Sequence, residues 1–370
     1  DGQVRPEVYN TFTRQPCATM CLGTEFWRRK YAGLAEQAVR ELGVDGIYMD
    51  QACTSLACYD RTHGHPLGGG TYWMKGFRTM SEDFRQRCQG LAGGAESLTP
   101  TARSPRRAMR PGLGLAGEGC GEAWLPDLDL MLSLQVSKER YAGPDGWEPI
   151  PFFHAVYHAY AVTYGNYSSL TMPPYDELWP GEFAPKEPLK LLDRKFSRQF
   201  CLEQARAFVW GQQPTIANFL PAHLEQRAQE MEFAMRLARL RSRAAKYLLH
   251  GTFLRPPELQ APEAMLDLSR LSIYAGQQGG LTTYQRPFAL VVAGAWRAPD
   301  GTVAIALASI AEDPLRLALP INTEYYRLPK RTKVYRLDET GRKPIGRWGK
   351  TPSPLVLDLP ARGACLLEFE

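Results

Sequence analysis

The chain has 370 residues, of which 44% are hydrophobic and 22% are charged, and this ordinary globular composition allows a sizeable buried core. Its net charge of +5, from 44 basic and 39 acidic residues, is mild for the length and argues against nucleic acid as the main partner. Apolar runs stay well short of the roughly 20 residues that a membrane-spanning helix needs, so we expect no membrane partner either.

Eight cysteines are spread thinly along the chain and form no paired CxxC signature of a zinc site. This usage is typical of free, mostly buried thiols in a reducing compartment, so we expect a cytoplasmic rather than a secreted protein. A disulfide between Cys53 and Cys58 is the alternative for those two residues.

The first regular elements lead to an acidic residue at the end of a strand. Residues 16–21 are expected to form a short strand, and apolar residues from Trp27 to Leu42 recur at helical spacing. After a glycine, the apolar residues 47–49 predict a buried strand that ends at Asp50. A helix followed by a strand with an acid at its C-terminal end is the pattern of one unit of a (β/α) barrel, where catalytic groups lie at strand ends.

A long polar loop, residues 51–73, follows this strand. It contains three consecutive glycines and the pair His63 and His65 close to Asp60. A loop of this length inside a compact domain is usually functional, so we expect it to line the same pocket. A second helix is predicted beyond it, around residues 77–84.

A further strand, residues 112–117, leads to the acids Glu118 and Glu122. More strands are predicted at residues 129–134, 150–157 and 206–210, and helices at residues 191–205 and 221–250. About six strands thus precede Pro256, where a closed barrel needs eight. Because the chain begins at Asp1 without a methionine, we expect the first barrel strands to precede it, in a longer protein or in a second chain. An open parallel sheet is the alternative.

The pattern changes after Pro257 to short apolar runs separated by turns. These runs predict strands at residues 288–292, 303–307, 315–319, 333–335, 355–357 and 364–370, with a hairpin signal at 298–301. The predicted fold class is therefore α/β. We expect the C-terminal portion of a (β/α)8-type TIM barrel as the catalytic domain, residues 1–254, and an all-β sandwich domain, residues 255–370.

Acidic side chains at predicted strand ends suit the cleavage of a glycosidic bond, which needs two carboxyls facing each other across that bond. Asp50 and Glu118, on neighbouring parallel strands about 4.8 Å apart, come within the separation that this chemistry requires. Glu122 is a second candidate for the acid, or a group that orients the substrate. Neighbouring strand ends favour the shorter carboxyl separation of retaining enzymes, ~5–5.5 Å.

Several side chains near the predicted strand ends suit a hydroxyl-rich ligand, because aromatic faces pack well on sugar rings. The predicted substrate-binding residues are Tyr48, Gln51, Asp60, His63, His65, Trp73, Trp124, His154, Tyr157, His158 and Trp210. Core packing of the tryptophans and structural roles for the histidines are the alternatives. The two histidine pairs with Asp60 also offer the ligand types of a zinc site, but we expect no metal and no cofactor.

Three motifs together resemble one family. They are Asp45-Gly46-Ile47-Tyr48-Met49-Asp50-Gln51, then Tyr59-Asp60 with His63-Gly64-His65-Pro66 and Gly68-Gly69-Gly70, and Glu118-Gly119-Cys120-Gly121-Glu122. Over most of residues 15–250 the chain resembles an uncharacterised bacterial glycoside-hydrolase-like family, domain of unknown function 6259. That family is distantly similar to the barrels of endo-alpha-N-acetylgalactosaminidases. The resemblance implies Asp50 as the nucleophile and Glu118 as the acid, although the early strands are missing and two glutamates compete.

Together these observations predict a retaining glycosidase that acts on a carbohydrate with an alpha-linkage and leave the sugar open. A non-catalytic carbohydrate-binding or assembly subunit is the first alternative. A metal-dependent hydrolase that uses the histidines is the second.

Overall fold

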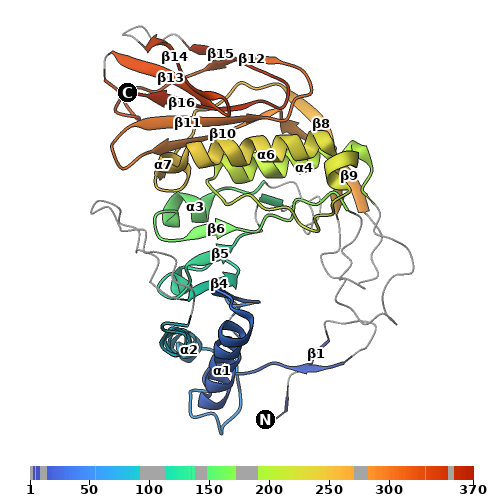
Figure 1. Cartoon of the computed structure of the whole chain (residues 1–370), viewed down its shortest axis with the longest axis vertical. Coiled ribbons are helices and arrows are strands. Elements are labelled where there is room, and N and C mark those ends of the chain that lie inside the picture. The colour runs from blue at the N-terminus through green and yellow to red at the C-terminus, as the bar shows by residue number, and fades with distance from the viewer. Residues whose placement is uncertain are drawn as a thin grey trace. The chain divides into compact units, whose positions relative to one another are not determined.

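The computed structural model describes residues 3–4, 6–8, 15–54, 56–91, 113–134, 136–137, 148–171, 191–270, 282–329, 331–348 and 354–370. Contacts between residues divide the chain into two units, and Figure 1 labels most of their elements. The first unit holds residues 1–133 and 160–162, and the second holds residues 134–159 and 163–370. The predicted domains, residues 1–254 and 255–370, are a different division that these contacts do not test.

The first unit contains a parallel sheet with two helices. Its elements are β1 (Pro6–Glu7), β2 (Cys17–Ala18), α1 (Glu25–Leu42), β3 (Gly46–Met49), α2 (Tyr72–Arg87), β4 (Gly114–Glu118), the 3-10 helix η1 (Glu122–Trp124) and β5 (Leu130–Leu132). Strands β3, β4 and β5 are parallel neighbours, and β6 (Val162–Tyr164) follows β5 in the order of the sheet. The helices and strands predicted between residues 27 and 134 are thereby confirmed.

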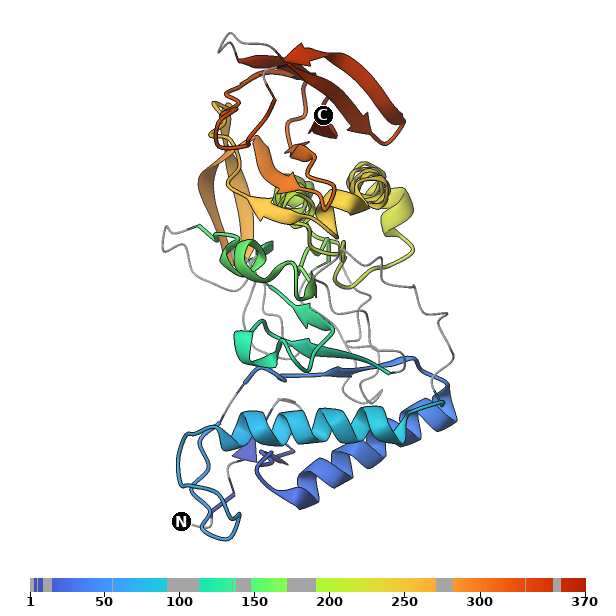
Figure 2. The same cartoon turned by 90° about the vertical axis from the view of Figure 1, so that its left-hand side faces the viewer.

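Helices α1 and α2 lie side by side (Figure 2) because each carries an apolar stripe at helical spacing. Ala32, Ala35 and Val39 are buried on α1. Across the contact, the rings of Tyr31 and Phe84 meet edge to face with their centroids 5.4 Å apart. Met49 of β3 is buried as well, so this strand contributes to the core of the first unit.

The expected strand at residues 16–21 is mostly wrong. Only β2 is a strand there, and it pairs antiparallel with β1 rather than joining the parallel sheet. The chain then turns, with Thr24 N donating to Cys21 O over 3.1 Å, and enters α1. Since Cys21 and Leu22 are buried in that turn, the apolar character of the segment reflects a packed turn rather than a longer strand.

The second unit contains most of the antiparallel strands. Its remaining elements are α3 (Phe152–Tyr157), η3 (Arg194–Phe196), α4 (Ser197–Val209), α5 (His223–Gln226), α6 (Ala228–Arg243), α7 (Ala245–Leu248), β7 (Thr252–Leu254), β8 (Glu263–Arg270), β9 (Thr282–Ala289), β10 (Val291–Arg297), β11 (Val303–Ser309), β12 (Leu315–Leu319), β13 (Thr332–Asp338), β14 (Gly341–Trp348), β15 (Leu355–Leu359) and β16 (Ala364–Phe369). One sheet has the order β14-β13-β16-β11-β10-β7, and β12-β15 and β8-β9 form two-stranded sheets.

Alternation along β11 builds a core on each face of the six-stranded sheet. Val303, Ile305 and Leu307 belong to a core cluster with β12 and β15. Ala304 and Ala306 belong to another, with α4 and α6, which lie along this sheet in Figure 1. All elements of the described residues after Pro257 are strands, as predicted, while a sandwich domain in the strict sense stays a prediction.

Three further predictions about elements are corrected. Residues 152–157 are helix α3 and not a strand, and residues 206–209 are the last turn of α4. Because α4 is buried nearly all round, its apolar end has no polar face that would mark it as a helix. The expected single helix over residues 221–250 is divided into α5, α6 and α7. Strands β1, β6, β7, β8 and β14 were not predicted.

The described residues thus form a mixed α/β fold with one parallel sheet and several antiparallel ones. Closure of the parallel sheet into a barrel stays a prediction. Among these residues, every helix is too short or too polar to cross a membrane.

Candidate active site

Two carboxylates meet where neighbouring strands end. The parallel register pairs Met49 with Gly117, so the next residue along each strand, Asp50 and Glu118, lie beside each other. The backbone N–H of Gln51 donates to Oε2 of Glu118 over 2.9 Å. This arrangement on adjacent strands is the one predicted from the sequence.

The turns that follow the two strands hold this geometry in place. Gln51 takes a left-handed conformation with φ 51°, and Gly119 does so with φ 90°. Cys53 N donates to Glu118 O over 3.1 Å, and Gly119 N donates to Leu132 O of β5 over 3.1 Å. At Gly117 a Cβ atom would lie 2.7 Å from the Cβ of Ala52, so the loop after Asp50 packs directly on β4.

The two carboxylates have different surroundings. Asp50 is exposed and accepts a hydrogen bond from the hydroxyl of Tyr48, at 3.1 Å from Oδ1. Partial burial raises the pKa of Glu118, and the neighbouring negative charge of Asp50 raises it further, against the opposite effect of the Gln51 N–H. A pair of acids in unlike environments is the usual basis for dividing acid and nucleophile roles between them.

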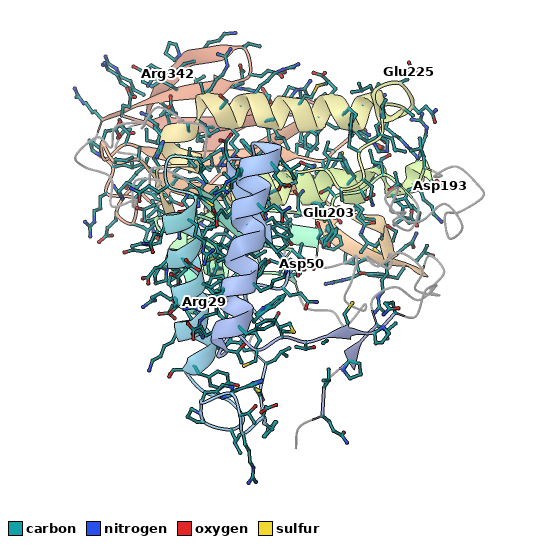
Figure 3. The ribbon with its side chains drawn as sticks, turned by 60° about the horizontal axis from the view of Figure 1, so that its bottom comes forward. Arg29, Asp50, Asp193, Glu203, Glu225 and Arg342 are labelled. Carbon is teal, nitrogen blue, oxygen red and sulfur yellow. The ribbon has the colours of Figure 1, made fainter. Side chains whose placement is uncertain are left out.

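Asp50 also faces a pocket of about 440 Å³ within the first unit. Figure 3 labels Asp50 close to α1, and its charge adds to burial in raising the pKa of Tyr31 on that helix. Other lining residues are Trp27, Leu34, Met49, Gln51, Trp73, Phe77 and Met80. Most of the lining is apolar, and Glu118 and Glu122 are absent from the described residues that form it. The pocket and the carboxylate pair therefore share Asp50.

Glu122 and the two predicted tryptophans of this unit are placed differently. Glu122 is exposed at the start of η1. Trp124 is nine-tenths buried and packs edge to face on Phe77 with centroids 6.5 Å apart. Trp73 lines the pocket. The indole nitrogens of both tryptophans are buried and have no hydrogen-bond partner among the described residues.

The histidines of the loop lie against two cysteines. His63 contacts Cys58, and His65 contacts Cys21. None of these four, nor Asp60, is among the residues that line the pocket, so their predicted contact with substrate stays a prediction. Sequence reasoning noticed the histidines and missed the cysteines, although Cys58 precedes His63 by only five residues.

The alternative disulfide between Cys53 and Cys58 is absent from this structure, which has both residues as free thiols. The Cys53 Sγ lies 3.4 Å from Gly119 O, and the Cys58 Sγ lies 3.2 Å from His63 Nδ1. Each thiol thus has its own polar neighbour.

The remaining predicted substrate contacts, Tyr157 among them, belong to the second unit. His154 of α3 is fully buried, and burial lowers its pKa to about 4. Its ring lies 5.6 Å from that of Trp210, and the ring of His158 meets Trp296 edge to face at 4.6 Å. These contacts are typical of a protein core. A role in binding substrate stays a prediction for His154, Tyr157, His158 and Trp210.

Comparisons with known proteins match one family model and two curated relatives. Residues 1–168 match the model of the family described as "Domain of unknown function (DUF6259)", which confirms the resemblance over that part of the chain. A protein of Bacteroides thetaiotaomicron named "Putative glycoside hydrolase" is 33% identical over 87 residues, which are 23% of this chain and 13% of that protein. "Putative glycoside hydrolase 22789" of Monosiga brevicollis is 25% identical over 143 residues, which are 38% of this chain and 10% of that protein.

This chain therefore spans about a tenth of the length of the curated relatives it matches. Among solved structures, a noncanonic maltogenic alpha-amylase from Thermotoga neapolitana is 11% identical with a TM-score of 0.49, and the match covers 95% of this chain and 68% of that one. A match at that level carries no argument about chemistry.

Proposed function

We propose that this chain, whose residues 1–168 match DUF6259, is a glycoside hydrolase that cleaves an alpha-glycosidic bond with retention of configuration. Asp50 is the nucleophile and Glu118 is the acid and base. The observation that carries the proposal is the pair itself: two carboxylates at neighbouring strand ends, of which Glu118 has a raised pKa caused by burial and by Asp50. The names of the curated relatives support the class of reaction.

In the first step, a carboxylate oxygen of Asp50 attacks the anomeric carbon while protonated Glu118 donates its proton to the departing glycosidic oxygen. The bond between the anomeric carbon and that oxygen breaks, and a glycosyl ester of Asp50 forms. In the second step, Glu118 takes a proton from water, and the water oxygen attacks the anomeric carbon and releases Asp50. A raised pKa suits the first step because Glu118 must still hold its proton when substrate binds.

Neighbouring groups have supporting roles in this proposal. The Tyr48 hydroxyl, which donates to Asp50, orients the nucleophile, and the Gln51 N–H orients the acid. Trp73 lines the pocket beside Asp50 and offers a sugar ring apolar surface. Glu122, which is exposed, is the competing candidate for the acid.

A panel of nitrophenyl glycosides, in both anomeric configurations, tests the proposal on the 370-residue chain. We expect turnover of an alpha-glycoside, release of the alpha-anomer first as followed by NMR, and loss of turnover in Asp50→Asn. Asp45→Asn is the matched control, because Asp45 is an exposed acid that precedes the same strand and its backbone carbonyl, which the substitution keeps, accepts from Gly114 N.

Release of the inverted sugar would contradict the retaining mechanism. Binding of a sugar without hydrolysis, measured by calorimetry, would favour the non-catalytic carbohydrate-binding alternative.

A further inference from the structure

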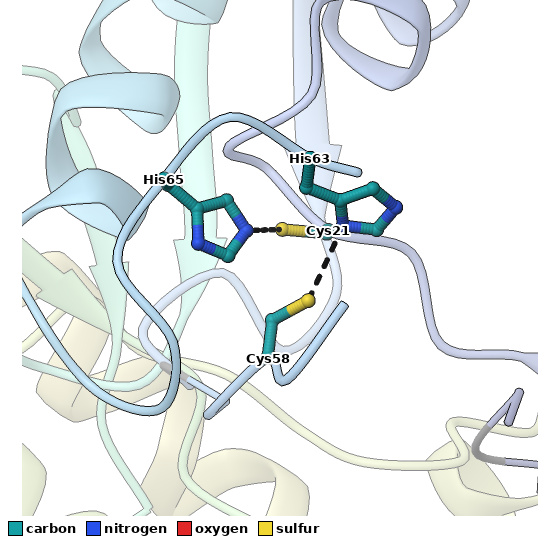
Figure 4. A group of neighbouring side chains, drawn as sticks. All are labelled: Cys21, Cys58, His63 and His65. Carbon is teal, nitrogen blue, oxygen red and sulfur yellow. Dashed lines mark hydrogen bonds between the residues drawn. The ribbon is translucent and has the colours of Figure 1, made fainter. Parts of the chain in front are cut away.

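Four side chains with metal-binding atoms converge in the first unit, outside the carboxylate pair (Figure 4). Cys21 comes from the turn before α1, and Cys58, His63 and His65 come from the loop after Asp50. One ligand atom from each residue lies within 4.8 Å of the ligand atoms of the other three. Cys21 Sγ is 3.3 Å from His65 Nε2, and Cys58 Sγ is 3.2 Å from His63 Nδ1.

These distances are close to those of a tetrahedral zinc site. Zinc binds sulfur at about 2.3 Å and imidazole nitrogen at about 2.0–2.1 Å, so neighbouring ligands in a tetrahedron lie roughly 3.5 Å apart. The two sulfur–nitrogen distances already approach that value. The other ligand atoms lie at most 4.8 Å apart, so a contraction of about 1.3 Å at most would complete the tetrahedron.

Each histidine also has an oxygen atom near its other ring nitrogen, and such an oxygen is the usual support of a metal-bound imidazole. His65 Nδ1 lies 2.8 Å from Pro66 O, so this nitrogen carries the proton and Nε2 presents its lone pair to the centre. His63 Nε2 lies 3.7 Å from Oδ2 of Asp60. Asp60 is itself held by Thr62, whose N and Oγ1 donate to Oδ1 over 2.7 and 2.6 Å.

The loop that carries three of the four residues is closed by its own hydrogen bonds. Cys58 and Gly68 exchange backbone N–H groups and carbonyls at 3.1 and 2.7 Å. The Tyr72 hydroxyl accepts from Cys58 N over 2.9 Å and donates to Gly68 O over 2.6 Å. Gly64, with φ 71°, lies between the two histidines, in a conformation that favours glycine.

The turn before α1 is shaped to meet this loop. The His65 ring stacks on Tyr72 with centroids 3.9 Å apart, and a Cβ atom at Gly23 would lie 2.5 Å from Cδ2 of that imidazole. Glycine at position 23 therefore gives His65 the room to reach Cys21.

We infer that Cys21, Cys58, His63 and His65 bind one zinc ion that fixes the loop after Asp50 to the start of α1. Two sulfur and two imidazole ligands suit Zn²⁺ and exclude a preference for Mg²⁺ or Ca²⁺, which favour oxygen. Four protein ligands leave no open position for water or substrate, so the ion is structural. The inference does not depend on the proposed glycosidase chemistry.

Metal analysis of the full 370-residue chain tests the site directly. We expect one zinc ion per chain after purification. When zinc is removed by a chelator under reducing conditions and replaced by Co²⁺, we expect the ligand-field spectrum of tetrahedral cobalt together with thiolate-to-cobalt charge-transfer bands. A spectrum without those bands, or a folded and reduced chain that binds neither metal, would overturn the inference.

Variants identify the ligands. Cys58→Ser and His65→Ala should lose the bound ion, whereas Cys17→Ser, an exposed thiol four residues before Cys21, should keep it. His63→Cys, which preserves a zinc-binding atom, should also retain it. Asp60→Asn should weaken zinc binding about 10- to 100-fold, since it alters only the support of His63.

Two further results must be separated from loss of a zinc ligand: a variant that does not fold, and oxidation of Cys21 and Cys58. If a ligand variant fails to fold, as seen by circular dichroism, the cobalt spectrum of the unmodified chain and the His63→Cys variant still decide. A thiol count below the eight cysteines of the sequence in the zinc-loaded chain, with Cys21 and Cys58 found joined as a disulfide, would overturn the site.

Discussion

At the scale of single residues, Asp50 and Glu118 illustrate how environment separates two identical functional groups. Asp50 is exposed with a tyrosine hydroxyl on one oxygen, whereas Glu118 is half-buried with a backbone N–H on one oxygen and a carboxylate beside it. Burial and like charge both penalise the ionised form of Glu118. The proposed division of roles therefore follows from where each side chain lies.

The acid can be identified by its dependence on the leaving group. Glu118→Gln should lower the rate about 10²- to 10⁴-fold for substrates with poor leaving groups, because only these need the proton. With nitrophenyl glycosides, whose leaving group is already acidic, the rate of the first step should fall far less. If Glu122→Gln produces this pattern and Glu118→Gln does not, Glu122 is the acid.

The raised pKa of Glu118 also predicts how stability depends on pH. Because the folded carboxyl binds its proton more tightly than the unfolded one, its favourable contribution is complete at low pH and is lost as pH rises through the folded pKa. Glu118→Gln removes the charge and keeps an oxygen for the Gln51 N–H. Its thermal midpoint should therefore exceed that of the unmodified chain at pH 7 and match it at pH 4.

The pH 4 measurement is the internal control of that experiment. A variant that is equally stabilised at both pH values would show that charge is not the cause, and a variant less stable at pH 7 would contradict the burial and repulsion inferred at Glu118.

At the scale of elements, replacing a glycine by alanine should have opposite effects on stability in the neighbouring helices α1 and α2. A Cβ atom at Gly33 of α1 would meet no atom within 4 Å, whereas one at Gly76 of α2 would lie 2.0 Å from Leu22 O. Gly33→Ala should stabilise the chain by about 1 kcal/mol, because alanine loses less backbone conformational freedom than glycine when the helix forms. Gly76→Ala should destabilise it by about 1–3 kcal/mol through overpacking.

Denaturant unfolding of both variants, compared with the unmodified chain, gives the two free energies. The same substitution in two helices of one unit controls for helix propensity, so a similar effect at both positions would refute the close packing of α2 on residues 22–23.

The sequence could predict those elements whose apolar residues recur at a spacing typical of one kind of secondary structure. Helix α1 repeats its buried residues every three or four positions, and β3 and β4 are short apolar runs that end in acids. Helix α4 has no exposed stripe, so the apolar residues at its end were mistaken for a strand. For the site, the neighbouring acids were predictable from strand order. The approach of Cys21 to His65 was not, because it depends on a turn and a loop 44 residues apart.

At the scale of the whole molecule, the second unit joins helices to the six-stranded sheet through one core. Phe200, Ala205 and Phe208 of α4 belong to the same cluster as Ala304 and Leu366 of the sheet. The indole nitrogen of a buried tryptophan on β10 also donates to the last carbonyl of α4 over 3.0 Å. A division of the chain at residues 254 and 255 would therefore run through a core.

This connection predicts the behaviour of two fragments. Residues 256–370 alone lack α4, α6 and β7, so the apolar face formed by Ala304, Ala306 and Leu366 would be exposed, and we expect aggregation or loss of cooperative unfolding. Residues 134–370 keep those helices and should remain soluble, with a cooperative thermal transition. Size-exclusion chromatography and circular dichroism of both fragments provide the measurement. If residues 256–370 fold cooperatively on their own, the domain boundary predicted at residue 254 is correct and the helices are dispensable to the sheet.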